Sequence, residues 1–283
     1  MKTKIFLVSL IVVTFSSSCS YRYYQVYKTK PSDDIVMNNH QLIFENESCR
    51  ISYDLWSEGG NIGFKFSNKT SENIYLNLEK SFFILNGIAH NYYKNREYEN
   101  STENSSPVAG FSLFSKLRNN QPLSNITIPT EISGKSMHNL VDSKGYNTIT
   151  YIEEKIVCIP PQTSKIISEY QINLALYRDC DLYKYPTKKQ ITTKKFNAED
   201  SPFEFRNLIT YTIGELSNEI KIENNFHVSE ITNYPEKEIT LRKYSEFCGQ
   251  KITYLDHRMR IFKFTSPDMF YIRYFKKGDG WVH

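Results

Sequence analysis

The chain has 283 residues and a mass of 33.3 kDa, and its composition is 40% hydrophobic, 23% charged and 14% aromatic. This composition excludes a disordered, collagen-like or polytopic membrane protein. The length permits one large domain or two small ones, and either can bury a core.

The first 18 residues are typical of a signal peptide. Lys2 and Lys4 supply positive charge, and a largely apolar run follows at residues 5–15. That run is too short to span a hydrocarbon core, which needs about 20 residues. Removal of residues 1–18 leaves 33 basic and 31 acidic residues, a net charge of +2, so charge gives no reason to expect a nucleic-acid partner.

A cysteine follows a run of small residues at the end of this segment, in the order Ser16-Ser17-Ser18-Cys19. The order resembles the relaxed lipobox of Bacteroidetes-type bacterial lipoproteins, although Ser16 stands where leucine or another aliphatic residue is usual. The resemblance implies cleavage before Cys19, diacylation of its sulfur and acylation of its new amino group. Several acyl chains together give stable membrane attachment. The alternative is an ordinary secretory signal, with Cys19 as a free or paired thiol.

Residues 19–40 are predicted to be the lipidated N-terminus and a polar tether. Residues 41–283 are predicted to form a single mainly-β domain. Residues 94–147 break the strand pattern, and we expect a loop insertion there with a short amphipathic helix. A basic loop leaves open a subdomain split near residue 195.

Apolar and polar residues alternate with a period of two along much of the domain. Residues 49–56 and 62–66 alternate on either side of Gly59-Gly60, which predicts a hairpin-like pair. Residues 82–85 end at Asn86-Gly87, a strong turn signal. Many short strands with this spacing predict a β-sandwich, immunoglobulin-like or related.

The likeness to Bacteroidetes-type lipoproteins extends over roughly residues 16–95 and the Ile159-Pro160-Pro161 segment. The motifs that carry it are Tyr53-Asp54-Leu55-Trp56, Gly59-Gly60, Asn68-Lys69-Thr70 and Ser81-Phe82-Phe83-Ile84-Leu85-Asn86-Gly87. That family has no assigned activity, so the resemblance implies a location in the cell envelope and no catalytic residue. Residues 20–24 carry no acidic cluster of the kind that surface-exported lipoproteins often have. The expected location is therefore the outer membrane, facing the periplasm.

Four cysteines remain after Cys19: Cys49, Cys158, Cys180 and Cys248. An even number in an exported protein permits two disulfides, in any of three connectivities. The alternative is that they are buried free thiols. Their spacing does not decide between the two, because no pair lies within CxxC distance.

The sequence carries no local signature of catalysis, of a cofactor or of a metal. The HExxH, GxSxG and phosphate-loop motifs are absent. Asp179-Cys180-Asp181 lacks the glycine and terminal glutamate of a calcium loop. The pairs Glu153-Glu154 and Asp33-Asp34 are poor candidates for glycoside hydrolysis, since neighbours on a strand point to opposite faces. Six histidines lie outside metal-ligand spacing: His40, His90, His138, His227, His257 and His283.

Residues 242–283 carry a net charge of +5 and interleave aromatic with basic side chains. Such a pattern can stack on bases or sugars or lie at a lipid headgroup layer. It also arises from a strand with one aromatic core face and one basic solvent face, which is the commoner origin.

Three functions therefore stay open. The first is a lipid-anchored, non-enzymatic binding or structural protein of the cell envelope, with a protein or glycan as its further partner. The second is an envelope hydrolase with a site assembled from distant residues, which a cleft with two carboxylates or a serine near a histidine would favour. The third is a glycan-binding module, which a flat aromatic platform would favour.

Overall fold

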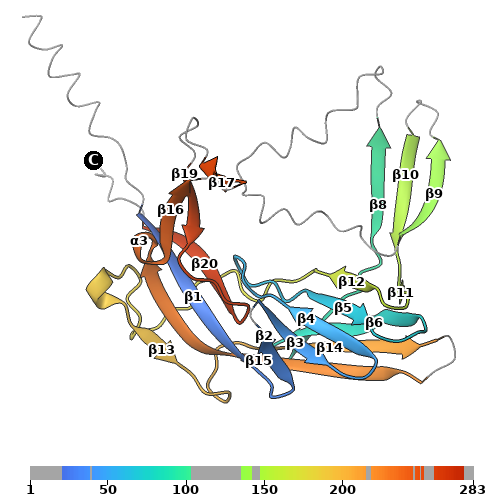
Figure 1. Cartoon of the computed structure of the whole chain (residues 1–283), viewed down its shortest axis with the longest axis horizontal. Coiled ribbons are helices and arrows are strands. Elements are labelled where there is room, and N and C mark those ends of the chain that lie inside the picture. The colour runs from blue at the N-terminus through green and yellow to red at the C-terminus, as the bar shows by residue number, and fades with distance from the viewer. Residues whose placement is uncertain are drawn as a thin grey trace, which may run out of the picture.

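The structure is a computed structural model that describes residues 21–38, 40–102, 135–141, 147–214, 218–244, 246–248, 250–251 and 258–276. Its strands form antiparallel sheets, and the two largest sheets pack face to face (Figure 1). The chain is therefore a mainly-β protein built on a β-sandwich, as the period-two alternation predicts.

The larger sheet has eight strands. In spatial order they are β11 (Ile156–Ile159), β6 (Ile74–Leu85), β14 (Glu204–Ile213), β15 (Ile220–Pro235), β1 (Tyr21–Pro31) and β20 (Met269–Lys276), with β13 (Thr193–Lys195) beside β15 and β7 (Ile88–Asn91) beside β6. A short 3₁₀ helix, η3 (Lys188–Gln190), precedes β13. The smaller sheet consists of β12 (Ser164–Ile167), β5 (Phe64–Asn68), β4 (Cys49–Tyr53), β3 (Gln41–Glu45) and β2 (Ile35–Asn38).

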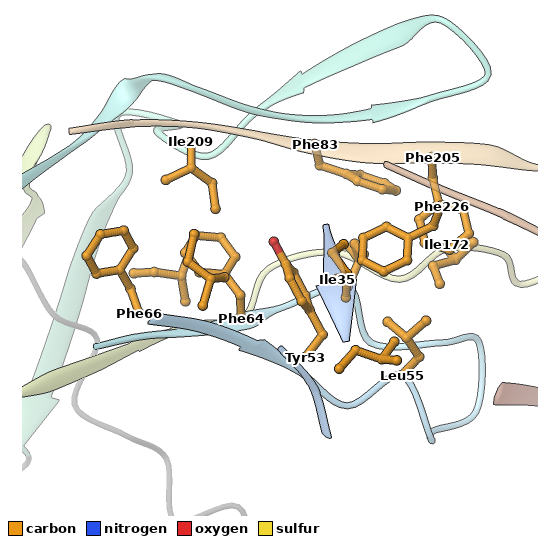
Figure 2. Packing of buried hydrophobic residues seen from close by; sticks show 14 of the residues in the cluster. Ile35, Tyr53, Leu55, Phe64, Phe66, Phe83, Ile172, Phe205, Ile209 and Phe226 are labelled. Atoms are coloured by element: carbon orange, nitrogen blue, oxygen red, sulfur yellow. The ribbon is translucent and has the colours of Figure 1, made fainter. Parts of the chain in front are cut away.

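The core lies between the facing sides of these two sheets. Figure 2 shows Tyr53, Phe64 and Phe66 of the smaller sheet pointing toward side chains of the larger one. The Tyr53 ring lies 5.3 Å from that of Phe226, and the Phe66 ring lies 5.4 Å from that of Tyr211. Each large apolar side chain that is fully buried here contributes about 1.5–3 kcal/mol to stability.

Several buried polar side chains of the sandwich are hydrogen-bonded, and one of these bonds joins the two sheets. The hydroxyl of Tyr53 donates to Asn224 Oδ1 at 2.7 Å. The hydroxyl of Tyr92 donates to Asn207 Oδ1 at 2.7 Å, and Asn207 Nδ2 donates to the carbonyl of Ile62 at 3.0 Å. Because a buried polar group without a partner is costly, these bonds favour one relative placement of the sheets.

The prediction of a tether at residues 19–40 is wrong for most of that range, because these residues form β1 and β2 of the sandwich. β1 lies between β15 and β20 and pairs with both along its length. Tyr27 and Thr29 are buried, and Thr29 Oγ1 donates to the carbonyl of Asp268 at 2.8 Å. After Pro31 the chain turns and enters the smaller sheet as β2. The described fold thus begins at Tyr21 and not at residue 41.

The expected insertion at residues 94–147 contains strands where a loop was predicted. β8 (Glu97–Thr102), β10 (Asn147–Glu153) and β9 (Lys135–Val141) form an antiparallel sheet in the order β8-β10-β9. This sheet, which we call the arm, stands away from the sandwich (Figure 1). Polar residues form strands here because ladder pairing with β10 satisfies their backbone groups. The predicted short helix lies outside the described residues.

Two predicted strand connections are present. Asn86 and Gly87 have φ of 46° and 81° and join β6 to β7 in a two-residue hairpin. β4 and β5 are neighbours, with Tyr53 opposite Phe64. Gly59 and Gly60 lie in the longer loop between them, and this loop contacts β20, since the amide of Gly59 donates to the carbonyl of Tyr271 at 2.8 Å.

A smaller layer covers the outer face of β1 and β20. It comprises α3 (Glu236–Ile239) and the hairpin of β16 (Thr240–Tyr244) with β19 (Arg258–Phe262), while β17 (Glu246–Phe247) and β18 (Gln250–Lys251) form a separate two-stranded sheet. Tyr24, Val26 and Ile239 form a second buried cluster beneath it. β1 is therefore covered on both faces. Within the described ranges, no helix is long and apolar enough to cross a membrane.

Candidate functional site

A hollow of about 540 Å³ lies where β1 ends and β14 begins, on the outer face of the larger sheet. Its polar rim consists of the charged side chains of Lys30, Asp33, Glu204 and Arg206 together with the imidazole of His227. The turn after β1 and the turn between β6 and β7 close two of its sides, since Ser32 and Gly87 also line it. The hollow is a candidate ligand site.

Strand register brings three of these side chains into one row. Lys30 on β1 stands opposite His227 on β15, and Glu204 on β14 stands opposite the same histidine. Residues directly opposite in antiparallel strands have Cβ atoms about 4.5–5.5 Å apart. Lys30 and Glu204 are exposed and His227 is half-buried. The row therefore offers a cation, an imidazole and a carboxylate to one small ligand.

The imidazole in this row is held neutral near pH 7. Burial lowers the pKa of His227 below its usual 6.5, and the Lys30 ammonium lowers it further, while Glu204 acts in the opposite direction. A neutral imidazole carries one donor and one acceptor. With the cations of Lys30 and Arg206 and the carboxylates of Asp33 and Glu204, the rim suits a polar ligand that both donates and accepts hydrogen bonds.

A hydrolase would need a reacting group paired with this histidine. Among the described residues, no hydrogen bond joins a serine, cysteine or carboxylate side chain to His227. Ser32, which also lines the hollow, donates instead to Asp34. The described residues that line the hollow therefore show no nucleophile paired with His227 as its base.

We expect an NMR titration of the His227 ring protons to give a pKa below 6.5, and Lys30→Gln to raise that pKa. Between the lowered pKa and 6.5 the unfolded chain binds more protons than the folded one, so stability falls as the pH drops through this window. Lys65→Gln, on the smaller sheet, is the control and should leave the titration unchanged. A wild-type pKa at or above 6.5 would contradict the placement of His227.

A second cluster fixes the base of the arm to the sandwich. Arg96 donates to Glu153 at 2.7 Å and to both carboxylate oxygens of Glu169 at 2.8 and 3.0 Å. The backbone amides of Lys94 and Arg96 donate to the second oxygen of Glu153 at 2.9 and 3.1 Å. The Lys94 ammonium bonds to Glu169 at 2.8 Å and lies 4.5 Å from the centre of the Tyr170 ring.

This cluster determines the ionisation of Glu153, which is buried. Burial by itself raises the pKa of a carboxylate, but Arg96 and the two amides outweigh it, and the pKa of Glu153 is lowered. We call Arg96, Glu153 and Glu169 the arm clamp. It connects the first and last residues of the arm to the segment after β12.

No sequence pattern predicts the arm clamp, although Glu153, one of its members, belongs to an acidic pair named in the sequence analysis. The pair Glu153-Glu154 separates as expected for a strand, with Glu153 buried and Glu154 exposed. Asp33 and Asp34 both lie in the exposed turn after β1, and only Asp33 lines the hollow. The Asp179-Cys180-Asp181 segment is bound by a lysine, since Lys194 contacts Asp179 at 2.5 Å and Asp181 at 3.2 Å.

The structure places three of the six histidines. His40 is exposed, His90 stacks on Phe83 with ring centres 5.9 Å apart, and His227 lines the hollow. The side chains of His138, His257 and His283 lie outside the described residues. Over the part of the chain that is described, no group of three His, Cys, Asp or Glu residues has the arrangement of a metal site.

The described part of the basic C-terminal segment contains a strand with two unlike faces. In β20, Phe270, Ile272 and Tyr274 are buried, whereas Arg273 is exposed. Nearby aromatic side chains pack against one another instead of forming a flat platform, because Trp56 meets Phe262 at an interplanar angle of 88°.

Of the two alternatives left open for the four cysteines, the structure has free thiols: Cys49, which is buried, and Cys158, Cys180 and Cys248, which are exposed. Burial raises the pKa of Cys49 to about 11, so its thiol is protonated and unreactive at neutral pH. The lipidation site Cys19 lies outside the described residues.

Comparison with known proteins identifies no relative: no family model matches the chain, and no curated protein or solved structure does. Function is therefore inferred from the residues and geometry of this chain alone.

Proposed function

We propose that this protein is a lipid-anchored, non-enzymatic binding module of the bacterial cell envelope. Residues 1–18 act as the export signal, Cys19 carries the lipid, and the β-sandwich holds the ligand-binding surface. The lipobox-like order of Ser16-Ser17-Ser18-Cys19 and the apolar run before it are the sequence basis of the proposal.

The observation that carries the proposal is that every described strand lies after Cys19 in the chain. The described residues of β1 are Tyr21–Pro31, so cleavage between Ser18 and Cys19 removes no described strand. The remaining chain keeps β1 between β15 and β20 and retains every residue of the core cluster.

The hollow supports binding as the role of the exported domain. Lys30 comes from β1, whereas Glu204 and His227 come from the consecutive strands β14 and β15, far from β1 in sequence, and strand pairing brings the three together. Ligand sites are commonly concave and combine apolar walls with a few fixed polar groups. A protein or glycan of the envelope remains the proposed class of partner.

Metabolic labelling of the producing cells with an alkyne fatty acid tests the anchor. Wild type should take up label, and Cys19→Ala should not, because it lacks the sulfur that the diacylglycerol modifies. Cys158→Ala removes an exposed thiol elsewhere and should label like wild type. Protease treatment of intact cells then tests the side, since a periplasm-facing protein should stay protected. Equal absence of label from wild type and Cys19→Ala would overturn the anchor.

A further inference from the structure

Only a very short stretch of chain separates Cys19, the proposed site of the lipid, from β1. Two peptide units separate Cys19 from Tyr21, and a fully extended chain covers at most about 7 Å over that length. Tyr21 is the first residue of β1. A lipid on Cys19 therefore holds this end of the sandwich against the membrane surface, with no room for the flexible tether that the sequence suggested.

Exposed aromatic and basic side chains surround this end of β1. Tyr21 stands opposite Lys276 and Arg22 stands opposite Phe275, all in the β1–β20 ladder. Tyr21 is 61% exposed and Phe275 45% exposed, which is high for large apolar side chains. Arg22 lies over the Phe275 ring, 5.5 Å from its centre.

The inner side of the same end carries tyrosines with lysines over them. The Tyr23 ring lies 5.3 Å from Tyr185 and 5.6 Å from Tyr274. Lys184 and Lys276 both lie over the Tyr185 ring, at 5.1 and 5.8 Å from its centre. Tyrosine with flanking lysine is a typical combination at the level of lipid headgroups.

Two acidic residues of α3 at this end are already paired with cations. Glu236, at the start of α3, pairs with Arg22 at 2.9 Å and with Arg260 at 2.8 Å. Glu238 pairs with Lys188 at 3.7 Å. By contrast, no ion pair among the described residues includes Lys184, Lys237 or Lys276. Figure 1 shows α3 beside the start of β1, so these charges share one end of the molecule.

We infer that this end of the sandwich docks on an anionic phospholipid surface. The docking face consists of Tyr21, Lys184, Tyr185, Lys237, Phe275 and Lys276. Its lysines attract the lipid phosphates, and its exposed rings enter the headgroup layer. The inference rests on the proposed lipidation of Cys19, which brings the face to the membrane, and it adds a fixed orientation to that anchor.

Orientation follows from the direction of β1. Its 11 residues span roughly 33 Å from Tyr21 to Pro31, at about 3.3 Å per residue. The hollow at Lys30 is therefore held away from the lipid surface and faces the envelope space. An undocked, freely rotating sandwich would present the hollow in every direction.

Photo-crosslinking in the full-length protein tests the face. A benzoyl-phenylalanine in place of Phe275 should form crosslinks to phospholipid in cells that carry the wild-type Cys19. The same probe in place of Val36 is the matched control, since Val36 is 66% exposed and lies beyond the far end of β1. It should give no lipid adduct. Both positions are exposed, so the probe should not disturb the core.

The charges are tested by combining Lys184→Gln, Lys237→Gln and Lys276→Gln. Each lysine near an anionic surface contributes about fivefold to membrane affinity, so the yield of lipid adduct at position 275 should fall about tenfold or more. The combined control Lys65→Gln, Lys165→Gln and Lys221→Gln removes three cations from other surfaces and should leave the yield unchanged.

Fatty-acid labelling of the same cells separates the two ways of failing. Label on Cys19 without lipid adducts at position 275, or with equal adducts at positions 36 and 275, would overturn the docking face and leave the anchor intact. Absence of label would overturn the anchor. Lipid adducts confined to position 275 in that case would still support the face as a lipid-binding surface.

Discussion

Replacement of Gly60 by alanine should destabilise the protein by about 3 kcal/mol, a large effect for a single methyl group. Gly60 has a φ of +76°, a conformation that costs a residue with a side chain about 1 kcal/mol. A Cβ at this position would also lie 2.8 Å from Ile172 Cδ1 and 2.8 Å from Phe270 Cγ. Relieving those contacts requires movement of the core, at a further cost of about 1–3 kcal/mol.

Gly87→Ala is the matched control for this substitution. Gly87 has a φ of +81°, close to that of Gly60, but nothing lies within 4 Å of its Cβ position. Gly87→Ala should therefore lower the free energy of unfolding by only about 1 kcal/mol, which is the cost of the backbone conformation. Urea unfolding of both variants measures the difference. Equal losses would show that the loop around Gly60 moves freely away from Ile172 and Phe270.

Arg96→Met should destabilise the protein by about 2 kcal/mol, because it leaves the buried Glu153 carboxylate without its cation. Breaking a fully buried ion pair costs about 3–5 kcal/mol, and the value is smaller here since the Arg96 side chain is 33% exposed. Methionine keeps much of the aliphatic stem, so the loss reports the charge and not the packing. Denaturant unfolding at pH 7 measures it.

Lys94→Met provides the comparison for the arm clamp. The Lys94 side chain bonds to the same Glu169 but is 39% exposed. Lys94→Met should therefore lower the free energy of unfolding by less than about 1 kcal/mol. Adding Glu153→Gln to Arg96→Met should recover part of the loss, because no buried charge then remains. Since the pKa of Glu153 is lowered, the wild-type clamp contributes above pH 4.5 and is lost as the pH falls below that value. An Arg96→Met variant as stable as Lys94→Met would contradict this account.

Local sequence signals predict the strands that have one face toward the core and the other toward solvent. The turn at Asn86-Gly87 and the pairing of β4 with β5 are examples, because alternation and turn residues lie close together in the chain. β1 was missed for the opposite reason. Tyr24, Gln25, Val26 and Tyr27 are all buried, since the sandwich covers one face and the α3 layer the other. A strand buried on both faces shows no period-two pattern.

The hollow and the arm clamp were beyond local prediction because their members are distant in sequence. Lys30 and His227 meet only through the register of β1 and β15, which a one-residue slip would destroy. His227 was one of six scattered histidines, and Lys30 lay in a segment read as a tether. Within the clamp, Arg96 and Glu169 are separated by 73 residues. No motif marks such a pair.

The place of β1 in the larger sheet also has a consequence for the export that we propose. β1 is the first strand of the described chain, and its two neighbours, β15 and β20, are formed by residues 220–235 and 269–276. A chain that crosses a membrane from its N-terminus therefore delivers β1 long before either neighbour. In such a chain the larger sheet is complete only after almost all residues have crossed the membrane. Until then the chain cannot complete this sheet, and it remains unfolded enough to pass through a translocation channel. Under the proposed lipidation, β1 is held at the membrane from the start, and β20 completes the larger sheet by pairing with it there.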